Sequence, residues 1–593
     1  MKTARAILSF ALGALPPTLG AVEPPAPVPP VPSPSQLAWQ RLEMTMFLHF
    51  GVNTFTDREW GDGKEDPAIF NPSALDARQW ARTAKDAGFG LVILTAKHHD
   101  GFCLWPSKFT GHSVKNSPWK GGTGDVVREF TDACREAKLK IGIYLSPWDR
   151  HEPCYGTDAY NTHFKHQLTE LLTDYGTIDE VWFDGACGEG PNGKKQVYDW
   201  DGYYGVIRRL QPKAVIAICG PDVRWVGNES GVARPGESSV QKRGNGSIWH
   251  PAECDVSIRP GWFYHAGEDG KVKPLDQLLD IYLKSVGRNS VLLLNVPPDR
   301  RGLLAAPDVK RLQELRAAID AMLKTNLAAG KAATADAVRG GAETYAAAKA
   351  VDGRIDTYWA AEDGASAGRI EIDLGTPAEF NLVNLQEPIE LGERSRKYRI
   401  EAEVGGAWTV LARGTAIGHR NLVGVPRTTA RKAALVIEEA RGVPAIAEFG
   451  LYRSPRAVKA EPRSLTAHKP AEASNVHGGG TVYGGDKAVD GDFETRWATS
   501  DETRACWLEV DLQEAKTIGR LAIHELEPRI TKFELQVRLK KDAPWKIAYS
   551  GGTAGKQFEA GFPAVPARYV RLNILEATFA PTIWEFQVFE AGE

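Results

Sequence analysis

Asp184 is the residue whose position most clearly suggests chemistry. It follows the apolar residues 181–183 and precedes Gly185, so it stands where an apolar strand would end. In parallel sheets and barrels, side chains at the carboxyl ends of strands form the active site. Hydrolysis of a glycosidic bond commonly uses two carboxylates, which a retaining enzyme holds about 5–5.5 Å apart as nucleophile and acid/base. Asp184 is therefore a candidate catalytic carboxylate, although it could instead cap a loop.

The residues alone do not identify the second carboxylate. Glu229, Glu237 and Glu253 all lie in later loops, and their chemistry does not separate them. The nucleophile must be ionised while the acid is protonated. The environments of the two carboxyl groups should therefore push their pKa values apart.

Histidine, tryptophan and acidic residues follow the other apolar segments. Aromatic rings suit the apolar face of a sugar, and imidazole, carboxylate and guanidinium groups suit its hydroxyls. We do not read His98 and His99 as metal ligands, because neighbours in an extended chain point in opposite directions. Trp60 and Trp262 could equally belong to a core. The residues themselves offer His49, Trp60, His98, His99 and Trp262 as candidates for sugar binding.

The pattern that must position these residues is an alternation of short apolar and amphipathic segments between residues 39 and 323. Such alternation predicts parallel strands joined by helices, and its length favours a (β/α)₈-type barrel. No Gly-x-Gly-x-x-Gly turn follows the first strand, which disfavours a nucleotide-binding sheet. The predicted strands are 46–51, 91–96, 141–146, 181–184, 214–219 and 291–295. The predicted helices are 77–87, 126–137, 160–175 and 276–285.

The second half of the chain contains a duplicated unit. The run Ala350–Gly353, followed by Thr357 and Trp359, recurs as Ala488–Gly491, followed by Thr495 and Trp497. Short β-like segments with turns replace the helical pattern here. We predict a multidomain protein: a catalytic barrel at 36–325 and two β-sandwich modules at 327–454 and 470–591.

The N-terminal region resembles an export signal. A basic start, a short apolar run and small residues before a cut after Gly20 are typical of a signal peptide, which we assign to residues 1–20. Seven prolines between positions 24 and 34 predict an extended, Pro-rich linker over 21–35. We expect an exported protein, periplasmic or secreted, with no membrane span. Most of the seven cysteines read as buried apolar residues.

Charge excludes one class of partner. The 593 residues carry 72 Lys and Arg against 75 Asp and Glu, which gives a net charge of −3. A nucleic-acid-binding protein would show a basic excess or a basic stripe. We therefore expect no nucleic-acid partner.

Several motifs, in this order, resemble the α-L-fucosidases of glycoside hydrolase family 29. They are His49-Phe-Gly, Glu59-Trp60, Lys97-His-His-Asp-Gly-Phe, Val181-Trp-Phe-Asp-Gly and Leu292-Leu-Leu-Asn-Val. The resemblance implies a (β/α)₈-like barrel, a double-displacement mechanism and no cofactor for catalysis. The family's nucleophile falls on Asp184, and its fucose contacts fall on His49, Glu59, Trp60, His98, His99, Tyr144, Arg259 and Trp262.

The loop Gly227-Asn-Glu-Ser-Gly231 resembles the acid/base loop of the subfamily that acts on α-1,3- and α-1,4-linked fucose of branched, Lewis-type glycans. This resemblance favours Glu229 as the acid/base. The implied partner is a fucosylated oligosaccharide or glycoconjugate. Two alternatives are an exo-glycosidase for a related sugar such as L-galactose, and a glycan-binding adhesin that has lost catalysis.

The two repeats resemble discoidin-like domains (factor 5/8 type C), many of which are carbohydrate-binding modules of family 32. In similar modules the repeated Ala-Val-Asp-Gly…Thr-x-Trp loop, together with a glutamate near the end of the module, often holds a structural calcium ion. The resemblance assigns calcium to Asp490, Thr495 and Glu585, with Asp352, Thr357 and Glu448 as their counterparts. A loop held only by hydrogen bonds is the alternative.

Overall fold

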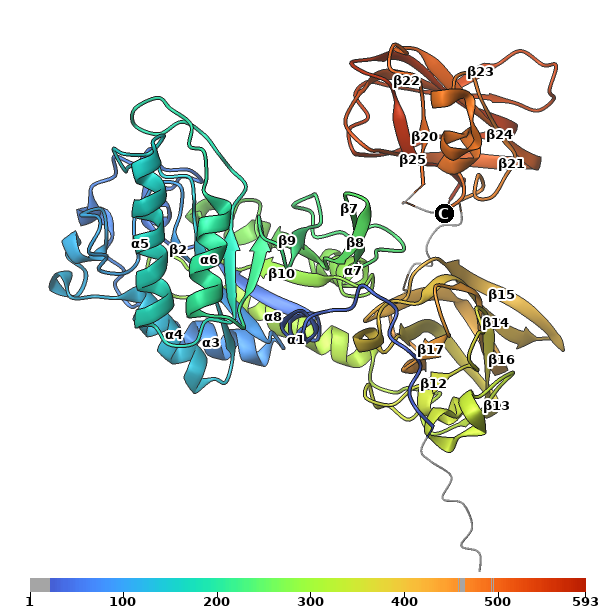
Figure 1. Cartoon of the computed structure of the whole chain (residues 1–593), viewed down its shortest axis with the longest axis horizontal. Helices are drawn as coiled ribbons and strands as arrows, with labels where there is room; N and C mark the ends of the chain where they lie inside the picture. The colour runs from blue at the N-terminus through green and yellow to red at the C-terminus, as the bar shows by residue number, and fades with distance from the viewer. Residues whose placement is uncertain (1–21, 457, 459–463, 492, 494, 593) are drawn as a thin grey trace, which may run out of the picture.

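The computed structural model describes residues 22–456, 458, 464–491, 493 and 495–592. The predicted signal peptide at 1–20 lies outside this part. A mostly parallel sheet, rolled into a nearly closed barrel, forms the N-terminal half, and two antiparallel β-domains follow it (Figure 1). The predicted fold class is confirmed.

The barrel strands follow one another in the spatial order β5-β4-β3-β2-β1-β10-β9-β6. All their mutual pairings are parallel. The strands are β1 (Met44–Leu48), β2 (Leu91–Lys97), β3 (Lys140–Leu145), β4 (Glu180–Phe183), β5 (Val215–Ile218), β6 (Arg224–Trp225), β9 (Ala252–Ser257) and β10 (Val291–Asn295).

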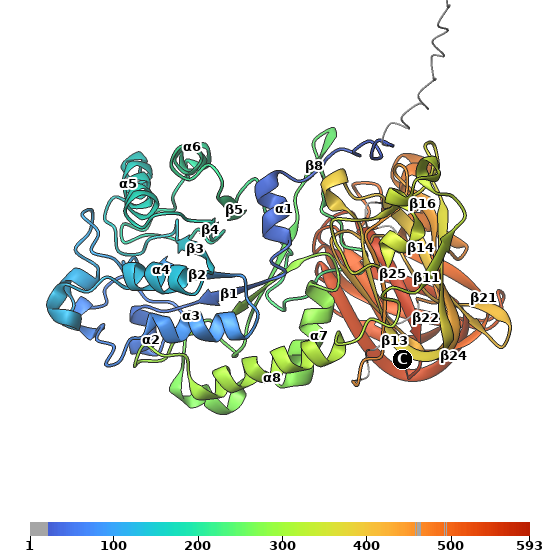
Figure 2. The same ribbon diagram turned by 90° about the horizontal axis from the view of Figure 1, so that it is seen from below.

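Helices cover the outside of the strand ring, as Figure 2 shows. Aspartates at the N-caps of α3, α4 and α6 accept backbone N–H groups and so fix where these helices begin. The helices are α1 (Pro34–Gln40), α2 (Val52–Thr56), α3 (Ala77–Asp86), α4 (Val126–Glu136), α5 (Asp158–Asp174), α6 (Trp200–Leu210), α7 (Leu275–Ser285) and α8 (Ala306–Met322). No helix of the described residues is long and apolar enough to span a bilayer.

The barrel has a seam between β5 and β6. Strand β6 has only two residues, and the described segment 219–223 before it contains no helix. A single antiparallel bridge between Cys219 and Arg224 joins the two strands there. A hairpin of β7 (Val240–Arg243) and β8 (Gly246–Trp249) separates β6 from β9. The loop 226–239 between β6 and β7 is therefore held by side chains rather than by a long strand.

Strand periodicity decides which side chains enter the barrel. Successive residues of a strand face opposite sides. Phe47, Trp182 and Leu293 belong to the apolar interior cluster of the barrel. Two residues further along their strands, the inward positions fall on residues 49, 184 and 295 at the mouth, which are His, Asp and Asn. The inward side chains are therefore apolar within these strands and polar at the carboxyl ends, where the barrel opens.

Each C-terminal module has its own buried core. Trp359 and Trp497, which the repeat pairs, are both fully buried in equivalent positions. The first module contains β11 (Ala332–Ala335), β12 (Trp359–Ala360), β13 (Gly368–Gln386), β14 (Ser395–Val404), β15 (Ala407–Gly414), β16 (Asn421–Ala440), β17 (Ala445–Ile446) and β18 (Glu448–Tyr452). The second contains β19 (Ala471–Ala473), β20 (Trp497–Ala498), β21 (Cys506–Glu525), β22 (Ile530–Arg538), β23 (Lys546–Gly551), β24 (Gln557–Ala577) and β25 (Thr582–Glu590).

The Pro-rich segment lies along the first module (Figure 1). Val28 donates its N–H to the carbonyl of Leu391 at 2.8 Å. The guanidinium groups of Arg394 and Arg441 bind the carbonyls of Ala26 and Pro29, each at 2.8 Å. The segment is extended, as its prolines predict. These bonds fasten it to the first module, so it does not act as a free spacer.

The first module is fixed to the barrel by a buried carboxylate. Glu393 accepts hydrogen bonds from Ser239 N at 2.8 Å and from the Asn289 amide at 2.6 Å. The same amide reaches the carbonyl of Glu237 at 3.1 Å. Asn289 thereby ties the end of the 226–239 loop to the first module.

Candidate active site

Asp184 follows β4 directly and lies at the barrel mouth. One carboxylate oxygen accepts the N–H of Ala186 at 2.7 Å. The other accepts the Tyr144 hydroxyl at 3.3 Å and lies 3.8 Å from Nε2 of His99. The side chain remains 28% exposed. Asp184 is therefore oriented by three groups and is still open to a ligand.

The histidines around Asp184 are buried and neutral. Burial lowers the pKa of His99 to about 4, against the opposing effect of the Asp184 charge, and Nδ1 of His99 lies 2.7 Å from the Ser146 hydroxyl. Burial also lowers the pKa of His98 well below its usual value. The His98 ring stacks on Tyr144 at 5.8 Å. A neutral imidazole offers both a donor and an acceptor, which suits hydroxyl groups.

His49 extends the same polar wall toward β10. Its Nδ1 lies 2.8 Å from the side-chain oxygen of Asn295, and its ring lies 5.1 Å from the Trp262 ring. Burial lowers the pKa of His49 to about 3. The Asn295 amide in turn donates to the Trp262 carbonyl at 2.8 Å. Asn295 thus links the imidazole to the loop that carries Trp262.

Glu59 joins two loops at the rim. Its carboxylate accepts the backbone N–H groups of Trp262 at 2.8 Å and Phe263 at 3.2 Å. It also lies 2.7 Å from Nε2 of His265, whose pKa is raised by Glu59 and Asp57 against the effect of burial. Glu59 therefore holds the Trp262 loop in place, whatever contact it makes with a ligand.

Trp60 stands above the site rather than in a core. Its side chain is 57% exposed, and its ring meets the rings of His99 and Trp148 edge-on at 5.9 and 5.7 Å. An exposed indole held by two aromatic neighbours is a ready platform for an apolar sugar face.

The three candidate glutamates have different surroundings. Glu237 is buried in ion pairs with Arg224 and Arg234. Glu253 is fully buried on the barrel floor, where it accepts the indole N–H of Trp182 at 2.7 Å. Glu229 alone among the three is exposed, in the loop after β6. Glu237 and Glu253 already have structural partners, whereas Glu229 is accessible to a ligand.

Arg259 is engaged by two aspartates. Its side chain is fully buried, with Nε 2.9 Å from Asp308 and a terminal nitrogen 2.9 Å from Asp269. It also stacks on Tyr264 at 4.7 Å. These contacts brace the loop before α7, and none of them joins Arg259 to Asp184. The sugar contact expected of Arg259 stays a prediction.

Sequence reasoning missed Asp255 and Trp225. Asp255 lies on β9, is 5% exposed, and accepts the indole N–H of Trp225 at 2.7 Å. Burial, with smaller contributions from the charges of Glu229 and Asp184, raises its pKa to about 7. The sequence signal that could have revealed Asp255 was a carboxylate at an inward position of β9, a strand that the apolar pattern did not predict.

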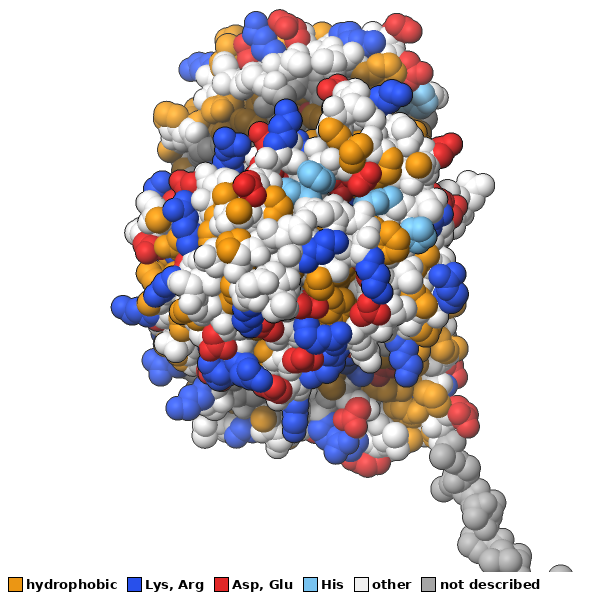
Figure 3. Space-filling model, turned by 90° about the vertical axis from the view of Figure 1, so that its left-hand side faces the viewer, with side chains coloured by type: hydrophobic (Ala, Val, Ile, Leu, Met, Phe, Trp, Pro, Cys, Tyr) orange, Lys and Arg blue, Asp and Glu red, His pale blue; other side chains and the backbone are white. Residues whose placement is uncertain are grey.

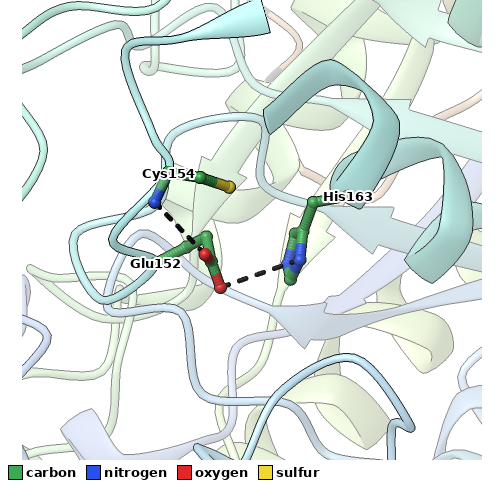
Figure 4. A group of neighbouring side chains, drawn as sticks. All are labelled: Glu152, Cys154 and His163. Carbon is green, nitrogen blue, oxygen red and sulfur yellow. Dashed lines mark hydrogen bonds and ion pairs between the residues drawn. The ribbon is translucent and has the colours of Figure 1, made fainter. Parts of the chain in front are cut away.

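Figure 4 shows a group of potential metal ligands outside the predicted ones: Glu152, Cys154 and His163. The Glu152 carboxylate accepts the Cys154 N–H at 3.2 Å and lies 3.7 Å from Nδ1 of His163. The pKa of the Cys154 thiol is raised to about 12, mainly by burial, which disfavours the thiolate that a metal requires. All seven cysteines are free.

The predicted calcium residues lie together in the second module. Thr495 donates its hydroxyl to Asp490 at 2.7 Å, and Glu585 accepts the N–H of Gly491 at 2.7 Å. These oxygen donors are chemically suited to calcium. The Lys487 ammonium group lies 3.6 Å from Asp490 and supplies competing positive charge. In the first module, burial raises the pKa of Glu448 to about 7, which makes that copy less suited to a cation.

Comparison with known proteins identifies the family. The α-L-fucosidase family model matches residues 36–321, and the F5/8 type C domain model matches 332–449 and 470–586. The chain is 46% identical to α-L-fucosidase 1 of Arabidopsis thaliana over 451 residues, which cover 72% of this chain and 88% of that protein. The chain belongs to the α-L-fucosidase family.

Solved structures agree with this assignment. A Ruminococcus gnavus family 29 fucosidase in complex with fucose is 36% identical with a TM-score of 0.70, covering 74% of this chain and 98% of that one. A family 29 member from an unknown rumen bacterium is 33% identical with a TM-score of 0.65, covering 96% of this chain and 100% of that one. This α-L-fucosidase is thus a glycoside hydrolase that also carries two discoidin-type domains.

We predict that His49 makes this fucosidase less stable in acid. The folded imidazole has a pKa of about 3, whereas the unfolded one has an ordinary value near 6.5. Between these values the unfolded state binds more protons, so stability falls as pH falls. The loss between pH 7 and pH 5 should be about 2 kcal/mol. Thermal unfolding of H49Q should show a shallower decline over this range than the wild type. Equal slopes would contradict the prediction.

Proposed function

We propose that this protein is a retaining exo-α-L-fucosidase that releases terminal α-1,3- or α-1,4-linked L-fucose from branched, Lewis-type glycans. Two observations carry the proposal: Asp184 is oriented and partly exposed, and Glu229 is accessible while Glu237 and Glu253 are engaged elsewhere. Basic and acidic side chains are interspersed on the barrel face in Figure 3, in keeping with a neutral sugar substrate.

In the first step, a carboxylate oxygen of Asp184 attacks the anomeric carbon as the glycosidic bond breaks. Glu229 donates its proton to the departing oxygen, so the aglycone leaves as an alcohol. Burial, reinforced by the Asp184 charge, raises the pKa of Tyr144 well above its usual value. Tyr144 therefore remains a hydroxyl donor that holds the nucleophile in position.

In the second step, Glu229 takes a proton from water, and the water oxygen bonds to the anomeric carbon. The bond to Asp184 breaks, which restores both carboxyl groups and gives net retention. This chemistry requires no cofactor. The proposed sugar contacts are the neutral His49, His98 and His99, with Glu59 and with Trp60 and Trp262 as aromatic walls.

The linkage proposal rests on the loop that carries Glu229. Asn228 closes this loop on itself, with its side-chain amide 2.8 Å from the carbonyl of Val232. Gly231 has a positive φ of 74°, and a Cβ there would meet Val256 and Ile281. Asn228 and Gly231 thus shape this compact turn, in which Glu229 is exposed.

We predict that D184A nearly abolishes turnover, because no other group can form the covalent intermediate. E229Q should lose about 10²–10⁴-fold in kcat on oligosaccharides, since the leaving oxygen is no longer protonated. With azide and an aryl fucoside, E229Q should yield α-fucosyl azide and D184A the β-anomer. D201N is the matched control, because Asp201 is an exposed residue of helix α6. Substantial activity in D184A would refute the assignment.

The substrate range is tested with a panel of oligosaccharides. We expect fucose release from α-1,3- and α-1,4-fucosylated trisaccharides, α-fucose as the first anomer seen by NMR, and little release from α-1,2 linkages. Strong hydrolysis of the α-1,2 substrate would overturn the linkage proposal. Faster hydrolysis of an aryl α-L-galactoside than of the aryl fucoside would favour L-galactose as the substrate. Glycan binding without any hydrolysis would favour the adhesin.

We further propose that the protein is exported and that Asp490, Thr495 and Glu585 hold a structural calcium ion. The oxygen donors of this loop support the second point. Calcium at 100 times its dissociation constant should stabilise the second module by about 2.7 kcal/mol. Its melting temperature should therefore fall with EDTA and recover with calcium. D490A should abolish this response, whereas D352A, the counterpart in the first module, should retain it. A wild-type protein insensitive to EDTA would refute the proposal.

A further inference from the structure

Trp225 is an exposed aromatic residue at the barrel mouth to which the proposed reaction assigns no role. It is 42% exposed and ends β6, four residues before Glu229. Its indole N–H is nevertheless fixed, 2.7 Å from the buried carboxylate of Asp255. An exposed indole with one anchored edge has a defined orientation and a free face, which is how aromatic rings bind sugars.

The strand register determines where this ring lies. Trp225 pairs with Glu253 of β9, and the inward positions of β9 are 253, 255 and 257. Glu253 faces the floor, and Asp255 stands one step nearer the mouth. Because the indole N–H reaches Asp255, the Trp225 side chain leans from the strand ring toward the mouth. It does not pack against the outer helices.

Trp225 lies at the edge of the barrel sheet, beside the seam. The proposed fucose contacts come from the ends of β1, β2 and β3, next to Asp184 after β4, and from the loop after β9. Trp225 belongs to β6 and Glu229 to the loop that follows it, between β9 and the seam. The acid must stand beside the leaving oxygen, and the aglycone continues from that oxygen. The aglycone therefore lies on the side of Glu229 and Trp225.

We propose that Trp225 is the aromatic platform for the first sugar of the aglycone and that Asp255 is the positioning residue that fixes its ring. The inference rests on the proposed fucosidase reaction and adds a determinant of aglycone specificity. It also gives a role to the buried Asp255 carboxylate, which accepts the indole N–H of Trp225.

The test compares two substrates that share fucose but differ in aglycone. An α-1,4-fucosylated trisaccharide requires the platform, whereas α-L-fucosyl fluoride has no aglycone sugar and needs no acid. W225A should raise KM and lower kcat/KM on the trisaccharide by about 10- to 100-fold. Hydrolysis of the fluoride should stay within about twofold of the wild type. W408A, an exposed tryptophan of the first module, is the matched control.

Asp255 is tested through its bond to the indole. W225F keeps an aromatic face but loses the N–H, so it should show a smaller loss on the trisaccharide than W225A. D255N should show a similar loss, expressed as the trisaccharide rate relative to the fluoride rate. The double variant W225F/D255N should be no worse than either single variant, because the same contact is removed. Fully additive losses would overturn the role of Asp255.

The outcomes separate this inference from the proposed function. A wild-type protein inactive on both substrates would refute the fucosidase reaction itself. Wild-type activity on both, with W225A unchanged on the trisaccharide, would refute only the platform. Equal losses of W225A on both substrates would show that the ring supports the catalytic centre instead, and this would also refute the platform. W225F provides the same comparison if W225A does not fold.

Discussion

The buried ion pairs of Glu237 are the interaction on which the arrangement of the site depends. Strand β6 is too short to hold the loop that follows it, yet that loop carries Glu229. Although burial raises the pKa of Glu237, the charges of Arg224 and Arg234 lower it to about 2, so the carboxylate stays ionised. Arg224 belongs to β6 and Arg234 to the far part of the loop, so Glu237 closes the segment into a ring. Removal of one residue of these ion pairs would leave a buried charge without full compensation, which is strongly unfavourable.

Strand periodicity made much of the site predictable. An inward position continues past the end of a parallel strand, so polar residues directly after apolar runs had to meet at one mouth. His49 and Asp184 lie where this argument put them, and Tyr144 faces inward at the end of β3. The predicted strand 291–295 has the observed bounds of β10. The fold class followed from the same alternation, since parallel strands with covering helices have few ways to close.

The features that sequence could not predict depend on contacts between distant residues. Strand β6 has two residues and no apolar run, so it lacks a periodic signal. Asp255 becomes relevant only through Trp225, thirty positions away. The sequence likewise gives no sign that Asp308 and Asp269 engage Arg259. The proline pattern gave an extended segment at 24–34 without indicating that its carbonyls would meet arginines of the first module.

The same contacts give the C-terminal modules a physical connection to catalysis. Asn289 binds both the Glu237 carbonyl and the Glu393 carboxylate of the first module. The Arg234 guanidinium, which pairs with Glu237, lies 5.7 Å from the Phe493 ring of the second module. Both modules therefore contact the second half of the 226–239 loop, at Glu237 and Arg234, whereas the first half presents Glu229. A module that bound no glycan would still restrict this loop, because a loop with both ends fixed has fewer conformations to lose when substrate binds.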